Sequence, residues 1–144
     1  MEVGFSRAFA RPCLQGKRHM SYVLNMTQHA ATADQMSAGV VEPADKRVVQ
    51  ELLTFEELPD AQDILRRAAA LAGIARESGH PACMIGGAPF FMAPLEHALE
   101  KVGVKTLYAF SKRESVEVLD PQTGSVKKTQ VFKHAGFVEA VPRG

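Results

Sequence analysis

The stretch that most constrains the fold is residues 82–111, which reads as a strand, a turn, a helix and a second strand. Its parts are the apolar residues 82–85, a glycine turn, the helical pattern of residues 90–102 and the strand pattern of residues 105–111. Parallel strands joined by a crossover helix imply a covered sheet. Because such sheets carry their functional groups at the carboxyl ends of the strands, this stretch predicts where a site lies.

Size and composition narrow the class of protein. A chain of 144 residues fits one domain, and a net charge of +1 gives no overall attraction to duplex nucleic acid or to an anionic membrane. No apolar run is long enough to span a bilayer. Cys13 and Cys83 form neither a disulfide framework nor a metal-ligand spacing, and the five histidines show no zinc spacing. We expect a cytoplasmic protein with no metal, no membrane partner and no duplex nucleic-acid partner.

The first twenty residues differ from the rest. They are basic and lack a clear period, and Arg11 and Pro12 interrupt any continuous apolar core that a signal peptide needs. We interpret residues 1–20 as a disordered extension and residues 21–144 as the domain. A targeting arm is one alternative. Another is an artefact of start-codon choice, since Met20 directly precedes the first strand pattern.

The remaining elements complete an α/β pattern. The expected elements are a strand at 21–26, a short helix within 30–38, a short strand at 40–41, a helix capped by Asp45, a helix at 60–78, and a hairpin formed by 115–119 and 125–132. This order predicts a single Rossmann-like domain with a mainly parallel sheet flanked by helices and a C-terminal antiparallel β-hairpin. The strands at 21–26 and 82–85 are expected to be adjacent and central.

The glycine turn is the first candidate binding site. Gly86 and Gly87 let a ligand approach the backbone closely, and the helix after Ala88 directs free N–H groups toward an anion such as phosphate. An alternative start of the regular helix is Pro94. A tight turn without a ligand explains the glycines equally well. The dinucleotide fingerprint with its acidic residue is missing, which argues against an NAD-type cofactor, and we expect none.

The second candidate follows the strand at 21–26. Thr27, Gln28 and His29 offer a hydroxyl, an amide and an imidazole, and His29 suits a general base or a phosphate contact. The alternative is that Thr27 caps the next segment and His29 is merely exposed. Adjacent parallel strands would bring these residues near the glycine turn.

The third candidate is the segment after Phe110. Ser111, Lys112 and Arg113 are expected to end the second strand of the unit and to lie on the same rim, where Lys112 or Arg113 neutralises phosphate. The alternative is a solvated loop in which Arg113 pairs with Glu114. The basic residues of the hairpin are best explained as a charged edge that discourages aggregation.

Four segments together resemble a known family. They are residues 25–29 (NMTQH), 85–89 (IGGAP), 107–117 (LYAFSKRESVE) and 131–137 (VFKHAGF). In this order the segments are similar to those of small standalone CRISPR-associated accessory proteins of the Csx type. That family is related to the CRISPR-associated Rossmann-fold (CARF) nucleotide sensors and includes ring nucleases. The resemblance covers residues 21–140, and the chain departs from the larger sensors because it lacks an effector nuclease domain.

The resemblance implies a homodimer that binds a cyclic oligonucleotide of the cyclic oligoadenylate type and cleaves it without a metal ion. His29 and Arg113 are the implied catalytic residues. The implied ligand-binding residues are Thr27, Gln28, Gly86, Gly87, Ala88, Ser111 and Lys112. Two alternatives remain open: a binding module that holds the nucleotide without turnover, and an α/β interaction protein that dimerises through Phe90, Phe91 and the hairpin.

Overall fold

A five-stranded sheet in the order β3-β2-β4-β5-β6 organises the chain. The structure is a computed structural model that describes residues 22–142, so the expected extension at 1–20 lies outside the described residues. The elements are β2 (Val23–Met26), α2 (Ala33–Ser37), β3 (Val40–Val41), α3 (Lys46–Leu53), α4 (Ala61–Ser78), β4 (Ala82–Ile85), α5 (Pro89–Lys101), β5 (Lys105–Leu119) and β6 (Val126–Glu139). The predicted mixed α/β class, mostly parallel with a C-terminal antiparallel pair, is confirmed.

The two short apolar strands lie side by side at the centre of the sheet, as predicted. β2 and β4 are parallel, with Val23 opposite Ala82 and Met26 opposite Ile85. Their carboxyl ends therefore finish level with each other. β3 extends the sheet beyond β2, and β5 extends it beyond β4, both in parallel.

The helices begin and end where the sequence signals them. The Asp60 carboxylate accepts a hydrogen bond from the Asp63 amide at the start of α4, and Gly79 ends that helix with φ 78°, a conformation that favours glycine. Pro89 begins α5 and Pro94 lies inside it, so the alternative start at Pro94 is wrong. Within residues 22–142, no helix combines the length and apolar character needed to cross a membrane.

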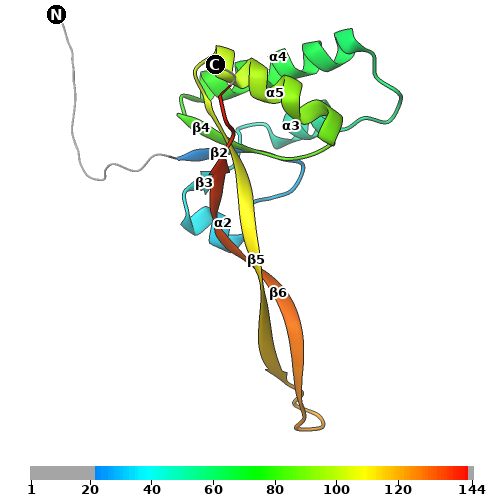
Figure 1. Ribbon diagram of the computed structural model, residues 1–144, viewed down its shortest axis with the longest axis vertical. Coiled ribbons are helices and arrows are strands. Elements are labelled where there is room, and N and C mark those ends of the chain that lie inside the picture. The colour runs from blue at the N-terminus through cyan, green and yellow to red at the C-terminus, as the bar shows by residue number, and fades with distance from the viewer. Residues whose placement is uncertain (1–21, 143–144) are drawn as a thin grey trace, which may run out of the picture.

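Long helices cover one face of the sheet rather than two. Leu24, Met26, Cys83 and Ile85 pack with buried residues of α3, α4 and α5 in the larger core. The opposite face carries the smaller cluster of Val23, Val40, Ala82 and Met84, against which Ala31, Leu107 and Phe137 pack. Figure 1 shows the three longer helices together on one side and the five-residue α2 on the other. The expectation of a sheet covered by helices holds for one face, because the segment that crosses the other face contains only α2.

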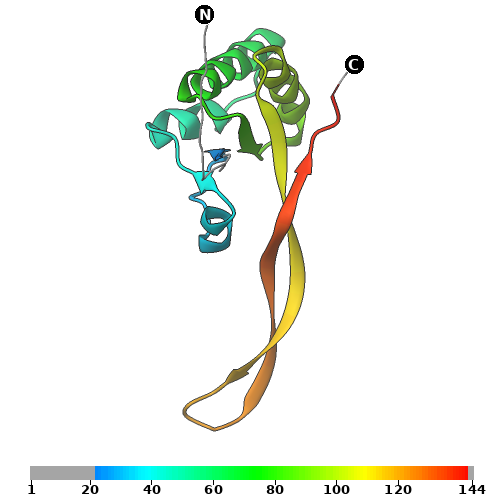
Figure 2. The same ribbon diagram turned by 90° about the vertical axis from the view of Figure 1, so that its left-hand side faces the viewer.

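β5 does not stop at Ser111. The strands expected at 105–111 and 115–119 form one strand, because β6 pairs with β5 as far as Leu119 and Val126. A bulge at Phe110/Ser111 shifts the register, and Gly136 beside it has φ 151°. Residues 110–135, which we call the arm, form a twisted two-stranded ribbon that extends away from the other described elements (Figures 1 and 2). The hairpin is thus confirmed, but it is longer than expected.

Candidate functional site

A buried asparagine shapes the loop that follows β2. Asn25 is polar, yet it is fully buried, and both of its neighbours in the strand are apolar. Its Oδ1 accepts hydrogen bonds from Thr27 Oγ1 at 2.7 Å and from the Thr27 amide at 3.1 Å. Its Nδ2 donates to the His29 carbonyl at 2.8 Å and to Glu42 Oε1 at 3.0 Å. One side chain therefore fixes the course of residues 27–29.

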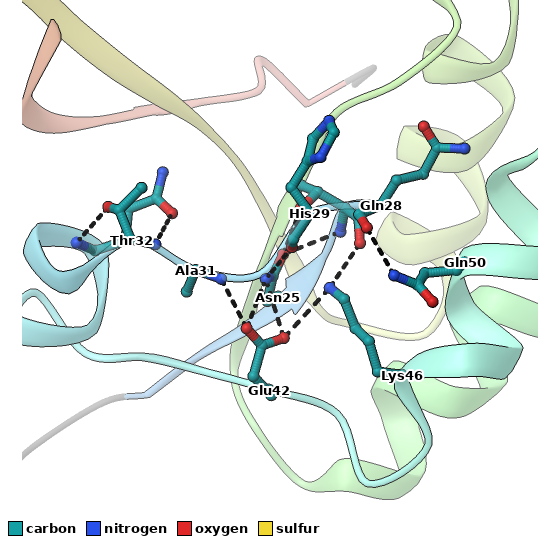
Figure 3. Close-up of polar contacts among 10 residues, drawn as sticks. Asn25, Gln28, His29, Ala31, Thr32, Glu42, Lys46 and Gln50 are labelled. Carbon is teal, nitrogen blue, oxygen red and sulfur yellow. Dashed lines mark hydrogen bonds and ion pairs between the residues drawn. The ribbon is translucent and has the colours of Figure 1, made fainter.

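Glu42, just after β3, joins the same network from the neighbouring strand (Figure 3). Its carboxylate accepts from the Ala31 amide at 2.7 Å and pairs with Lys46 Nζ at 3.3 Å. Lys46 also donates to the Thr27 carbonyl at 2.7 Å. Partial burial of Glu42 opposes ionisation, but hydrogen bonds from Ala31, Asn25 and Lys46 outweigh it, and the pKa of Glu42 lies below its ordinary value.

Gln28 fastens the loop to α3. Its Nε2 donates to Thr54 Oγ1 at 2.9 Å, and its carbonyl accepts from Gln50 Nε2 at the same distance. The side chains of Thr27 and Gln28 are thus held by the protein and act as positioning groups. His29 differs: its ring is exposed and stands away from the network in Figure 3.

The glycine turn lies next to this loop. A Cβ atom added to Gly86 would come 3.6 Å from Thr27 Cγ2, an ordinary contact, whereas Gly87 has φ 148° and its conformation favours glycine. α5 begins two residues later without a side-chain hydrogen bond at its N-cap, Ala88. The N-cap side chain therefore does not neutralise the positive end of the α5 dipole, a position that favours an anion.

The loop, the glycine turn and β5 enclose a cleft of about 500 Å³. Its lining consists of Thr27, Gln28, His29, Ala30, Thr32, Gln35, Met84, Ile85, Gly86, Gly87, Tyr108 and Ala109. None of these lining residues is Lys or Arg. Tyr108 donates a hydrogen bond to Glu96, and burial together with Glu96 raises its pKa, so the phenol stays protonated. Among the lining residues, His29 carries an imidazole, the side chain that most often serves as a general acid or base.

The structure brings two of the three predicted segments together and separates the third. Residues 27–29 and the glycine turn share the cleft, as their strands predicted. Ser111, Lys112 and Arg113 lie beyond it on the arm, opposite His134, Lys133 and Phe132. The expectation that they end a strand at the rim is wrong, because pairing with β6 continues the strand outward. The guanidinium of Arg113 lies 5.5 Å from the Phe132 ring centre.

Other side chains show little reactive potential. Cys83 is buried in β4, and burial raises the pKa of its thiol to about 12, so it remains an unreactive thiol. No group of three or more His, Cys, Asp or Glu residues in the described part of the chain could hold a metal ion.

The residues that the sequence reasoning missed are those of the network: Asn25, Glu42, Lys46 and Gln50. The one available signal was Asn25, a polar amide inside an apolar strand. Such a group requires hydrogen-bond partners when the strand is buried.

We expect Asn25→Leu to destabilise the fold by about 2–3 kcal/mol, because it removes the hydrogen bonds that a buried amide makes to Thr27, to the His29 carbonyl and to Glu42. Asn25→Asp should also destabilise it, because it places a second carboxylate beside Glu42. Denaturant unfolding measures both. An Asn25→Leu protein within about 0.5 kcal/mol of the wild type would contradict the role given to Asn25.

The lowered pKa of Glu42 makes its contribution pH-dependent. Its ionised form is stabilised in the folded state, so the stability that it adds is present above its ordinary value of 4.5 and is lost as pH falls below that value. The stability difference between the wild type and Glu42→Gln should therefore be constant from pH 7 to 5.5 and shrink below pH 4.5. A difference that stays constant down to the acid transition would contradict this.

Comparison with known proteins identifies a family. No curated protein and no solved structure matches the chain. The family model described as "Uncharacterized protein MJ1673 family" matches residues 21–138, which include the network, the cleft and the arm. The chain therefore belongs to the uncharacterized protein MJ1673 family.

Proposed function

We propose that the cleft binds a cyclic oligonucleotide of the cyclic oligoadenylate type and that the protein cleaves it as a ring nuclease. The observation that carries the proposal is the position of the cleft in the sheet. From β2 the chain leads outward to β3, and from β4 it leads outward to β5 on the other side. The carboxyl ends of β2 and β4 therefore form a topological switch point, where open α/β sheets bind their ligands.

The chemistry of the cleft supports a phosphate-bearing ligand. The uncapped N-terminus of α5 favours a negative charge, and the glycines leave the backbone accessible beside it. The resemblance to CRISPR-associated accessory proteins supports a cyclic oligoadenylate within this class, and it supports a Rossmann-like relationship to the CARF sensors. The switch-point arrangement is consistent with that relationship.

Cleavage would use the ligand's own nucleophile. A ribose 2′-hydroxyl attacks the neighbouring phosphorus, the bond to the 5′-oxygen breaks, and the products carry a 2′,3′-cyclic phosphate and a 5′-hydroxyl. This reaction needs no water and no metal ion as a reactant. His29, which lines the cleft, would accept the 2′-hydroxyl proton or donate one to the leaving 5′-oxygen. The protein otherwise supplies orientation and charge stabilisation.

Binding without turnover is the second candidate function. It is favoured by the lining of the cleft, which contains His29 and neutral groups but no Lys or Arg. Such a protein would sequester the nucleotide and stabilise itself when the nucleotide binds.

Gly86→Val tests binding. A Cβ at this position meets only an ordinary contact, so the variant should fold. The added methyl groups should project into the cleft. Affinity for cyclic tetra- or hexa-adenylate should therefore fall at least about tenfold, which is a change of about 1.4 kcal/mol in binding free energy. Calorimetric titration measures it, with Gly73→Ala on α4 as the control, because nothing lies within 4 Å of an added Cβ there. Wild-type protein that binds neither ring would sink the proposal.

His29→Ala tests turnover. If the protein cleaves labelled cyclic tetra- or hexa-adenylate, this variant should keep most of its affinity and lose on the order of 100-fold in single-turnover rate. EDTA should leave the wild-type rate unchanged. Binding without products from the wild type would select the second candidate, and an undiminished rate in the variant would remove His29 from the mechanism.

A further inference from the structure

The arm is long and exposed, and the other described elements of its own chain do not cover its outer half (Figures 1 and 2). Its strands run nine residues past the bulge to Leu119, which corresponds to roughly 30 Å at about 3.3 Å per residue. A two-stranded ribbon without a covering layer is marginally stable in water. Both ribbon views show its outer half clear of the other described elements (Figures 1 and 2).

The arm also exposes more apolar surface than solubility favours. Phe132 is 72% exposed. Half or more of Phe110, Val118, Leu119 and Val126 is also exposed. Because Leu119 pairs with Val126 while Val118 pairs with Lys127, apolar groups occur on both faces of the ribbon. Exposed apolar side chains gathered on one segment in this way are typical of an interaction site.

Charge indicates what covers the arm. Residues 110–135 contain five Lys or Arg and three Asp or Glu. Residues 22–109, which we call the body, contain seven Lys or Arg and eleven Asp or Glu. The arm is thus net positive and the body net negative, so the body of a second copy is an electrostatically complementary partner. The basic residues 1–20 are a poorer match, because they carry the same sign of charge as the arm.

One side chain at the base of the arm lacks a partner. Both ring nitrogens of His134 are buried without a hydrogen-bond partner among residues 22–142, while the ring packs edge-on against Phe137 with their centres 4.8 Å apart. A neutral imidazole carries one N–H donor and one acceptor nitrogen, and leaving such a buried group unpaired costs about 1–3 kcal/mol. A group supplied from outside the described chain would remove this cost.

We propose that two copies of this chain pair by exchanging arms, and that the basic residues of each arm complete the cleft of the other copy. The area is sufficient for a two-fold pair. One face of a ribbon roughly 30 Å long and about 10 Å wide offers about 300 Å², since strands lie about 4.8 Å apart. Each copy contributes its arm and the surface that receives the other arm, so the pair buries on the order of 1,200 Å², which is enough for a specific interface.

The second part of the proposal rests on the proposed function. The cleft is lined without Lys or Arg, yet a ligand with several phosphates needs cationic groups. Lys112 and Lys133 lie opposite each other on the arm, next to Arg113. In an exchanged pair these side chains would reach the cleft of the other copy, which gives Arg113 a charge-neutralising role although it does not line the cleft of its own copy.

The first experiment measures mass in solution by light scattering without any ligand. Wild-type protein should be a dimer, and Phe132→Asp and Leu119→Asp should each shift it toward monomer with unchanged circular dichroism. Leu65→Asp, which alters a residue 61% exposed on α4, should remain dimeric. A monomeric wild-type protein, or arm variants that dimerise like the wild type, would overturn the pairing. Two further results would also overturn the pairing. One is loss of the dimer when residues 1–20 alone are deleted, and the other is a dimer that forms only when RNA is added.

The second experiment tests whether the arm of one copy completes the cleft of the other copy or its own cleft. The readout is binding of cyclic tetra-adenylate. Gly86→Val blocks the cleft, and the double variant Arg113→Ser/Lys133→Ser neutralises the arm, so each alone should bind weakly. After co-refolding in equal amounts, random pairing of two-fold dimers should restore roughly a quarter of the wild-type sites. No restoration would show that each arm serves its own copy. Dimerisation without any wild-type nucleotide binding would retain the pairing and refute the proposed function instead.

Discussion

The arrangement of the site depends on the buried Asn25 amide. The parallel pairing of β2 with β4 brings two strand ends together, but it does not determine how the chain leaves the first of them. Asn25 does so by binding Thr27 and the His29 carbonyl while holding Glu42 of the neighbouring segment. Burying an amide costs free energy unless its hydrogen bonds are made, so the network favours the geometry in which Asn25 makes them. That geometry leaves the His29 ring exposed at the cleft.

The same topology explains both the cleft and the uneven covering of the sheet. The chain leaves β2 toward one edge and β4 toward the other, which opens a gap between their ends. Crossover connections in opposite directions also lie on opposite faces when both are right-handed. The connection after β2 contains only the five-residue α2, so long helices protect one face and the other depends on Ala31, Leu107 and Phe137.

Sequence patterns predicted the features of the fold that depend on residues near one another in the chain. The apolar strands, the Asp60 cap, the Gly79 stop and the helix from Pro89 follow from hydrophobic period, capping and backbone preference, and the structure confirms them. The end of β5 was mispredicted because no local signal separates a strand that stops at Ser111 from one that continues into a hairpin. Pairing with β6 decides it, and that contact is distant in sequence. The ties of Gln28 were missed for the same reason, since Thr54 and Gln50 are distant in sequence. The tie of Thr27 to Asn25 is local, and its signal was the polar amide inside an apolar strand.

The most direct test of the central claim, that a nucleotide phosphate binds at the end of α5 between the two strand ends, is a backbone amide NMR titration. Adding cyclic tetra- or hexa-adenylate should shift the Gly86, Gly87 and Phe90 amides first and most strongly, together with the His29 ring signals. The Leu65 and Gly73 amides on α4 should stay unchanged. The claim would be contradicted if saturation with either cyclic nucleotide left the signals of the glycine-turn amides unchanged. It would also be contradicted if only signals of residues away from the cleft shifted.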